Sequence, residues 1–127
     1  MTVKSVLFVC IENACRSQLA EAICNNNDEL DLVAYSAGSN PGLEINPKAI
    51  ASLQRIGIDH RGEPKGLSFY QDKTFDFVVG MGCGDKCPYI PGAKIIEWDI
   101  PDPKLMNQED FDSVRDLIKL KISSDLI

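Results

Sequence analysis

The sequence predicts a single α/β domain, in which a four-stranded parallel sheet carries helices on both faces. Two observations lead to this fold class. Short apolar runs alternate with segments of helical periodicity along all 127 residues, and no repeat, low-complexity tract or linker divides them. Strands that alternate with helices favour parallel pairing through right-handed crossovers. A chain of this length has room for one hydrophobic core, so we expect one domain over residues 1–127.

Each expected element follows from its own local pattern. Apolar runs predict strands over residues 5–9, 30–36, 75–81 and 93–98. Helical periodicity predicts helices over residues 17–26, 46–56 and 108–122, with a short helix over 67–71. In the second helix, Pro47 stands in the first turn and Gly57 just past the end, and Ile50, Leu53 and Ile56 are expected to form the inner face.

Several polar or reactive residues follow the expected strands directly. In a parallel sheet, ligands bind beyond the carboxyl ends of the strands. Cys10, Ser36, residues 81–83 and residues 99–102 all fall at such ends. We therefore expect these four separated segments to meet at one edge of the sheet.

The segment between the first strand and the first helix reads Cys10-Ile11-Glu12-Asn13-Ala14-Cys15-Arg16-Ser17. A tight loop before a helix N-terminus directs several backbone N–H groups at one point, which suits a tetrahedral oxyanion. The Arg16 guanidinium can pair with two oxygens of that anion, and with the helix dipole it favours the thiolate of Cys10. The loop thus predicts a nucleophile aimed at an oxyanion, whereas the plainer interpretation makes Cys10 a small buried hydrophobe.

Roles are also expected for three polar residues of this loop. Asn13 suits the left-handed backbone that a tight loop needs. Ser17 can donate a hydrogen bond to Cys10, or it can cap the helix. Glu12 is expected to point to solvent or to narrow the choice of substrate, since a carboxylate opposes an anion.

Charge and cysteine content limit the classes of partner. The net charge of −6 argues against nucleic acid or an anionic membrane as the main partner, so an anionic substrate needs a local positive pocket. The sequence offers no stretch suited to spanning a bilayer and no signal-peptide pattern. Five cysteines in such a chain predict a reducing compartment and a cytoplasmic location.

From end to end, the sequence resembles the low-molecular-weight protein tyrosine phosphatase superfamily, and within it the arsenate reductases that share its fold. The resemblance rests on four segments, which are residues 10–17, residues 18–22, Ser36-Ala37-Gly38 and Asp102-Pro103. It implies a phosphatase loop after the first strand. The residues that it assigns to oxyanion binding are Ile11, Glu12, Asn13, Ala14, Cys15, Arg16 and Ser17.

Further features resemble the reductase branch more than the phosphatase branch. Gln18 follows Arg16-Ser17, where phosphatases typically have proline. Cys83 and Cys87 follow the third strand, where reductases carry a redox pair. Residues 104–106 also lack the tyrosines that many phosphatases place there.

The resemblance implies a thiol relay that serves arsenic resistance. Cys10 attacks arsenate, and Asp102 acts as the general acid. Cys83 then attacks the Cys10 sulfur and releases arsenite, and Cys87 takes over the disulfide for an external dithiol, thioredoxin or glutaredoxin, to reduce. Residues four apart on a helical turn lie about 6 Å apart at Cα, within the range of about 4.4–6.8 Å for a disulfide, so the short Cys83–Cys87 spacing is feasible.

Other interpretations remain open at this stage. The main alternative is a phosphatase for phosphotyrosine or a small phosphomonoester, with a phosphocysteine at Cys10; another is a module that binds oxyanions or senses redox state without turnover. No tightly bound cofactor or metal is expected. A zinc ion held by Cys10, Cys15, Cys83 and Cys87 is disfavoured, because Arg16 would place a positive charge beside it. The resemblance also implies a potassium ion near Asn13, Glu21 and Ser36, as in some reductases. Whether an ion binds here stays open, because the Lys65 side chain can take its place.

Three further residues are expected to have structural positions only. Cys24 and Trp98 are expected to pack in the core, and His60 is expected to lie on the loop after the second helix.

Overall fold

The computed structural model describes residues 3–27, 31–70, 72–81 and 92–126. Its strands are β1 (Lys4–Cys10), β2 (Leu32–Gly38), β3 (Phe77–Gly80) and β4 (Lys94–Glu97), and its helices are α1 (Arg16–Asn25), α2 (Pro47–Gln54), the 3-10 helix η1 (Leu67–Tyr70) and α3 (Gln108–Asp125). The four strands form one sheet in the order β2-β1-β3-β4, and all neighbours pair in parallel. The expected α/β fold with a four-stranded parallel sheet is confirmed.

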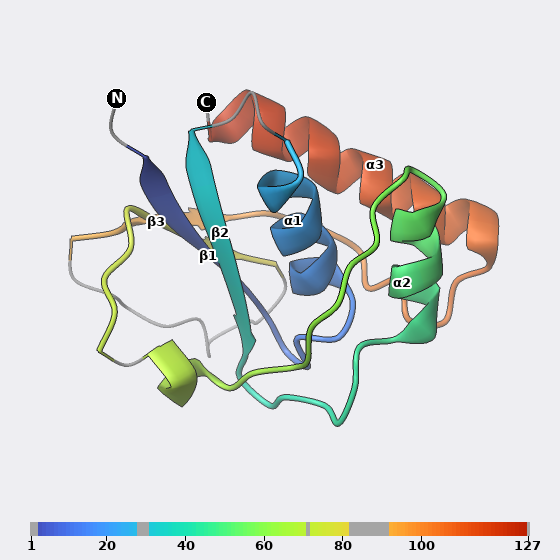
Figure 1. The fold of residues 1–127 in the computed structure, drawn as a ribbon, viewed down its shortest axis with the longest axis horizontal. Coiled ribbons are helices and arrows are strands. Elements are labelled where there is room, and N and C mark those ends of the chain that lie inside the picture. The colour runs from blue at the N-terminus through green and yellow to red at the C-terminus, as the bar shows by residue number, and fades with distance from the viewer. Residues whose placement is uncertain (1–2, 28–30, 71, 82–91, 127) are drawn as a thin grey trace.

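The two faces of the sheet are covered by different elements. Figure 1 shows α1, α2 and α3 on the same side of the sheet, with α1 between the strands and α3. On that side Val6 and Phe8 of β1 pack with buried side chains of these helices. Leu7 and Val9 pack on the opposite face with Phe75 and, at its margin, with side chains of η1. Among the described residues, α1, α2 and α3 all cover one face of the sheet, and the 3-10 helix η1 is the one helix on the other face. The expectation of helices on both faces is met only in this limited sense.

Several element boundaries differ from those expected. Strand β2 begins at Leu32 and not at residue 30. It continues to Gly38, two residues beyond the expected end, because Gly38 still pairs with Cys10. Helix α2 ends at Gln54 and not at Ile56, and Gly57 follows with a left-handed φ of 81°. Because Ile56 is 37% exposed, its assignment to the inner face of this helix is wrong, whereas Leu53 is fully buried.

Core assignments of two residues are confirmed. Cys24 is buried among the side chains of the main hydrophobic cluster. Trp98 is buried in the same cluster, where its ring lies 5.8 Å from that of Phe8, centroid to centroid. These contacts fix the end of β4 beneath α3, since Trp98 Nε1 also donates to Asp125 of that helix.

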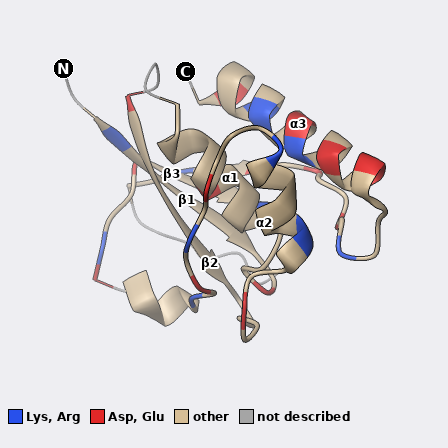
Figure 2. Cartoon of the chain, turned by 45° about the vertical axis from the view of Figure 1, so that its right-hand side comes forward, with Lys and Arg blue, Asp and Glu red and all other residues tan. Residues whose placement is uncertain are grey.

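A polar network joins α2 to α3. Asp112 accepts hydrogen bonds from Arg55 Nε at 2.8 Å and from Ser52 Oγ at 2.6 Å. The hydrogen bonds from Arg55 are the main reason why the pKa of Asp112 falls from 3.8 to about 2. Arg115, one turn further along α3, donates to the Ser52 carbonyl oxygen. Figure 2 shows acidic and basic residues interleaved along α3 in this way.

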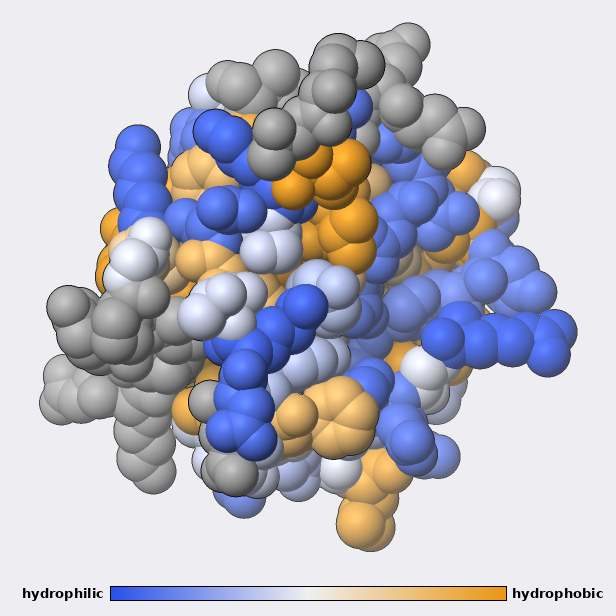
Figure 3. All heavy atoms as spheres, turned by 60° about the vertical axis from the view of Figure 1, so that its left-hand side comes forward, coloured by the Kyte–Doolittle hydropathy of each residue, from blue (hydrophilic) through white to orange (hydrophobic). Residues whose placement is uncertain are grey.

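The surface mixes polar and apolar side chains. On the face shown in Figure 3, hydrophobic residues form several small patches separated by hydrophilic ones. Among the helices of the described residues, none has both the length and the apolar character needed to cross a membrane.

Candidate active site

The strand register brings the expected segments to one edge of the sheet. Cys10 lies opposite Gly38 of β2, and Val9 lies opposite Gly80 of β3, so β1, β2 and β3 end together. Met81 follows β3 at this edge, and its N–H donates to the Val9 carbonyl oxygen. Ser36 is the exception, because it pairs with Phe8 and is buried two positions before the end of β2.

The loop after β1 is held by its carbonyl groups. The carbonyl oxygens of Cys10, Ile11, Glu12 and Ala14 accept hydrogen bonds from backbone N–H groups of residues 39–46. In a trans peptide, the N–H of the next residue points the opposite way to the carbonyl. The N–H groups of Ile11, Glu12, Asn13 and Cys15 therefore face away from residues 39–46.

Two backbone features make this loop possible. Asn13 has a left-handed φ of 54°, as expected from its residue type. Gly38 lies directly beneath the loop, where a β-carbon would come within 2.5 Å of the Ile11 carbonyl oxygen and 2.8 Å of the Asn13 nitrogen. Only glycine allows this approach, so the Ser36-Ala37-Gly38 segment is tied to the loop by close packing.

Cys10 and Ser17 are joined by a hydrogen bond inside the loop. The Cys10 sulfur lies 2.8 Å from Ser17 Oγ, and both residues are buried. Asn13 Nδ2 donates to the same Oγ at 2.7 Å, which leaves the Ser17 hydroxyl proton free to be donated to sulfur. The residue that caps α1 is Cys15, so the alternative role of Ser17 as the helix cap is wrong.

The hydrogen bonds continue from Asn13 to His60. Gln18 Nε2 donates to Asn13 Oδ1 at 3.0 Å, and Gln18 Oε1 lies 2.8 Å from His60 Nε2. Burial, and to a lesser extent the charge of Lys65, lowers the pKa of His60, which favours a neutral ring with its proton on Nε2. His60 does lie on the loop after α2. Its link to Gln18 was not predicted from the sequence, where a glutamine beside the apolar residues of α1 hints at a buried polar contact but not at the partner.

Arg16 and Asp102 lie on one side of the Cys10 sulfur. The Arg16 side chain is 9% exposed, and its Nη1 donates to the Ile100 carbonyl oxygen at 3.0 Å. Its Nη2 lies 3.9 Å from the carboxylate of Asp102, which is 55% exposed. The buried guanidinium therefore has one donor group on the Ile100 carbonyl oxygen and directs its Nη2 towards the carboxylate of Asp102.

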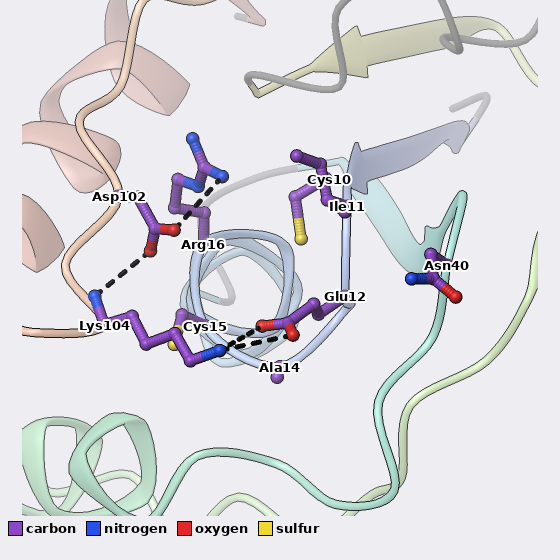
Figure 4. Close-up of a pocket in the computed structure, with 9 residues that line it drawn as sticks. All are labelled: Cys10, Ile11, Glu12, Ala14, Cys15, Arg16, Asn40, Asp102 and Lys104. Carbon is purple, nitrogen blue, oxygen red and sulfur yellow. Dashed lines mark hydrogen bonds and ion pairs between the residues drawn. The ribbon is translucent and has the colours of Figure 1, made fainter.

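These residues surround a pocket of about 240 Å³. Figure 4 shows the Cys10 sulfur between Arg16 and Asp102 on one side and Asn40 on the other. The lining residues are Cys10, Ile11, Glu12, Ala14, Cys15, Arg16, Asn40, Asp102 and Lys104. Asn40 and Lys104 were not predicted from the sequence to line this pocket. Lys104 stands two residues after Asp102, which was its one signal, whereas nothing in the sequence marked Asn40.

The two other cysteines that the structure describes, Cys15 and Cys24, are both buried. Burial raises the pKa of Cys15 to about 11, so its thiol stays protonated although it lines the pocket. The same cause raises the pKa of Cys24 to about 11. Cys83 and Cys87 lie outside the described residues.

The residues considered for potassium fit that ion poorly. Asn13 Oδ1 already accepts hydrogen bonds from Gln18 Nε2 and from the Lys65 backbone N–H. Burial raises the pKa of Glu21, while the positive charge of Lys65 acts in the opposite direction. Lys65 thus supplies positive charge near Glu21, where a cation would otherwise do so. Within the described part of the chain, no group of three or more His, Cys, Asp or Glu side chains is placed to hold a metal ion.

The fold and this loop define a class of protein. Residues 5–125 match the model of the low molecular weight phosphotyrosine protein phosphatase family, so the chain belongs to that family. Within the family, it is similar to arsenate reductases. The arsenate reductase of Staphylococcus aureus (strain Newman) is 35% identical over 129 residues, with 98% of this chain and 97% of that protein covered.

Solved structures show the same likeness. The thioredoxin-dependent arsenate reductase of Corynebacterium glutamicum superposes with a TM-score of 0.79 at 32% identity. The match covers 97% of this chain, which spans 60% of that protein's length. A structure described as an arsenate reductase in the phosphate binding state gives a TM-score of 0.83 at 28% identity, with 95% of both chains covered.

Proposed function

We propose that this protein is an arsenate reductase that converts arsenate to arsenite by a relay of three cysteines. The observation that carries the proposal is the arrangement around Cys10. Its sulfur lies in a pocket lined by Arg16 and Asp102, and Ser17 is placed to donate to it. Such a pocket combines a nucleophile, a cation and a carboxylic acid, which together suit attack on a tetrahedral oxyanion.

In this proposal the loop binds the substrate. The N–H groups of residues 11–17 and the Arg16 guanidinium hold the arsenate oxygens. The Cys10 thiolate attacks arsenic, and Asp102 protonates the departing oxygen, which leaves as water. Asp102 is suited to this role because it is mostly exposed and can exchange its proton with solvent.

Reduction follows when a second thiol attacks. The Cys83 thiolate attacks the Cys10 sulfur, an S–S bond forms, and the S–As bond breaks. The electron pair of that bond stays on arsenic, which leaves as arsenite. Cys87 then attacks Cys83 and frees Cys10, and an external dithiol reduces the Cys83–Cys87 disulfide. Thioredoxin is the expected reductant and glutaredoxin the alternative; either would place the protein in a reducing compartment such as the cytoplasm.

Phosphomonoester hydrolysis is the second candidate function. The match to the phosphatase family favours it, because Cys10, Arg16 and Asp102 would serve a phosphocysteine intermediate equally well. A phosphatase needs neither Cys83 nor Cys87, so these two cysteines discriminate between the candidates.

The test is arsenate-dependent consumption of NADPH in the presence of thioredoxin and thioredoxin reductase. Wild type is compared with Cys10→Ser, Cys83→Ser and Cys87→Ser, and with Cys24→Ser as the control for a buried cysteine outside the relay. Turnover that is lost in the first three variants and kept in Cys24→Ser supports the relay. Hydrolysis of a small phosphoester that needs only Cys10, without arsenate reduction, would instead make the protein a phosphatase.

A further inference from the structure

Glu12 and Lys104 form an ion pair across the pocket. Lys104 Nζ lies 3.3 Å and 3.2 Å from the two carboxylate oxygens of Glu12. Figure 4 shows Lys104 reaching from the segment that carries Asp102 to the loop that carries Cys10. The side chains of Lys104 and Glu12 are 51% and 42% exposed, so the pair bridges the pocket on its solvent side.

The backbone is held at both ends of this bridge. The Glu12 carbonyl oxygen accepts a hydrogen bond from the Gly42 N–H at 2.9 Å. At the other end, the Lys104 N–H donates to the Asp102 carboxylate at 3.1 Å, and the Lys104 carbonyl oxygen accepts from Lys48 Nζ at 3.3 Å. Because both segments are anchored, the two side chains meet without ordering a free loop.

The pair also balances charge in the pocket. A lone Glu12 carboxylate among the lining groups would repel an anion. Lys104 neutralises Glu12, as Arg16 offsets Asp102 at 3.9 Å. Lys104 therefore keeps Glu12 compatible with an anionic substrate, and Glu12 in turn holds the lysine side chain at the solvent side of the pocket, which is its mouth.

We propose that the Glu12–Lys104 pair is a specificity determinant, which selects a bare tetrahedral oxyanion over an organic phosphate ester. This inference rests on the proposed function, since it states which oxyanions the same pocket accepts. A bare oxyanion occupies the loop beneath the bridge. An ester bound in the same way must extend its organic group through the mouth, so the pair must separate before it binds.

Charge and bridging predict different results, which makes the inference testable by binding alone. The probes are inorganic phosphate and phenylphosphonate, which share a tetrahedral anionic head and are not turned over. Loss of charge changes the affinity for both probes in the same direction. Loss of the bridge changes the ratio of the two affinities, because only phenylphosphonate carries a group through the mouth.

Isothermal titration of both probes is carried out on the reduced full chain. Lys104→Met should weaken binding of both probes, because Glu12 becomes unpaired, and Glu12→Gln should strengthen both. In both variants, and in the double variant Glu12→Gln/Lys104→Met, the preference for phosphate over phenylphosphonate should fall about fivefold, the scale of one exposed ion pair. Lys104→Arg should retain the preference of wild type.

The controls address folding and the assigned activity separately. Lys119→Met removes an exposed lysine from α3 and should leave both affinities as in wild type. A preference that is the same within twofold in all variants would overturn the inference, as would the absence of phosphate binding by wild type. If wild type shows the preference but fails to reduce arsenate, the proposed activity is wrong and the selectivity of the pocket still stands.

Discussion

The hydroxyl oxygen of Ser17 lies 2.8 Å from the sulfur of Cys10, across the loop that joins β1 to α1. Asn13 donates to the same oxygen, so the direction of the hydrogen bond to sulfur is determined by a third residue. The chain of donors continues from Gln18 to Asn13 and from His60 to Gln18. Each donor points towards Cys10, an arrangement in which neighbouring hydrogen bonds strengthen one another.

Ser17→Ala should slow the reaction of Cys10 with arsenate by about tenfold or more, because a hydrogen bond to a charged group contributes about 1.5–3 kcal/mol. The measurement is single-turnover formation of arsenite at fixed pH. Ser113→Ala is the matched control, since that serine is exposed on α3. An unchanged rate in Ser17→Ala would show that the hydroxyl does not act on the sulfur.

Gly38→Ala should disrupt the anion-binding loop. Its β-carbon would come within 2.5 Å of the Ile11 carbonyl oxygen, and backbone on both sides is hydrogen-bonded. We expect a loss of about 1–3 kcal/mol in the free energy of unfolding, measured with urea, and loss of phosphate binding. Gly66→Ala is the control, because Gly66 pairs with Gly38 yet has no neighbour closer than 3.6 Å to an added β-carbon. Equal effects of the two substitutions would contradict the role of close packing at Gly38.

Asp102→Asn should reduce kcat for arsenate reduction by about 100-fold, the usual contribution of a general acid, while phosphate still binds. Asparagine keeps an oxygen that can accept the Lys104 N–H, so the segment should retain its shape. Steady-state kinetics and phosphate titration on the same preparations separate the two effects. Unchanged turnover would remove Asp102 from the role of acid.

The sequence predicted those features of the site that depend on local pattern. The apolar run of β1, the loop of residues 10–17 and the expectation of parallel strands were enough to place Cys10 and Asp102 at one edge. Ser36, expected at the same edge, lies two positions before it, because the end of β2 could not be located from the apolar run alone. The bridge from Glu12 to Lys104 was not predicted, because it joins residues 92 positions apart and depends on where one loop lies relative to another. The buried contacts of Gln18 were missed for a similar reason, since a polar residue on a helix carries no sign of the partner that it faces.

Asp112→Asn should destabilise the contact between α2 and α3. At neutral pH we expect a loss of about 1–2 kcal/mol, because Arg55 and Ser52 lose a charged acceptor. The pKa of Asp112 is lowered to about 2, so this stabilisation is present above pH 3.8 and is lost as the pH falls towards 2. Urea denaturation at several pH values tests both statements. Asp116→Asn is the control, as Asp116 is exposed and pairs with Arg115 of its own helix, α3. An equally large effect there would argue against a special role for Asp112.

His60→Gln should make the stability of the protein less sensitive to mild acid. The pKa of His60 is lowered from 6.5 by burial and by the charge of Lys65. In mild acid, His60 therefore binds a proton more readily in the unfolded chain than in the folded protein. Stability contributed by the neutral ring is therefore present above pH 6.5 and is lost progressively as the pH falls to the lowered pKa of the folded state. Glutamine cannot titrate, yet its amide N–H can still donate to Gln18 Oε1.

The measurement for His60→Gln is the free energy of unfolding from about pH 7.5 to 5.5, a range that spans the ordinary pKa of histidine. Glu21 lies 3.9 Å from His60, and because burial raises its pKa, proton uptake by Glu21 in acid acts in the stabilising direction. Glu21 and Lys65 are present in both proteins, so their effects largely cancel in the difference between wild type and variant. That difference should change in favour of the variant as the pH falls. Parallel curves for the two proteins would show that His60 does not remain neutral against Gln18 in the folded state.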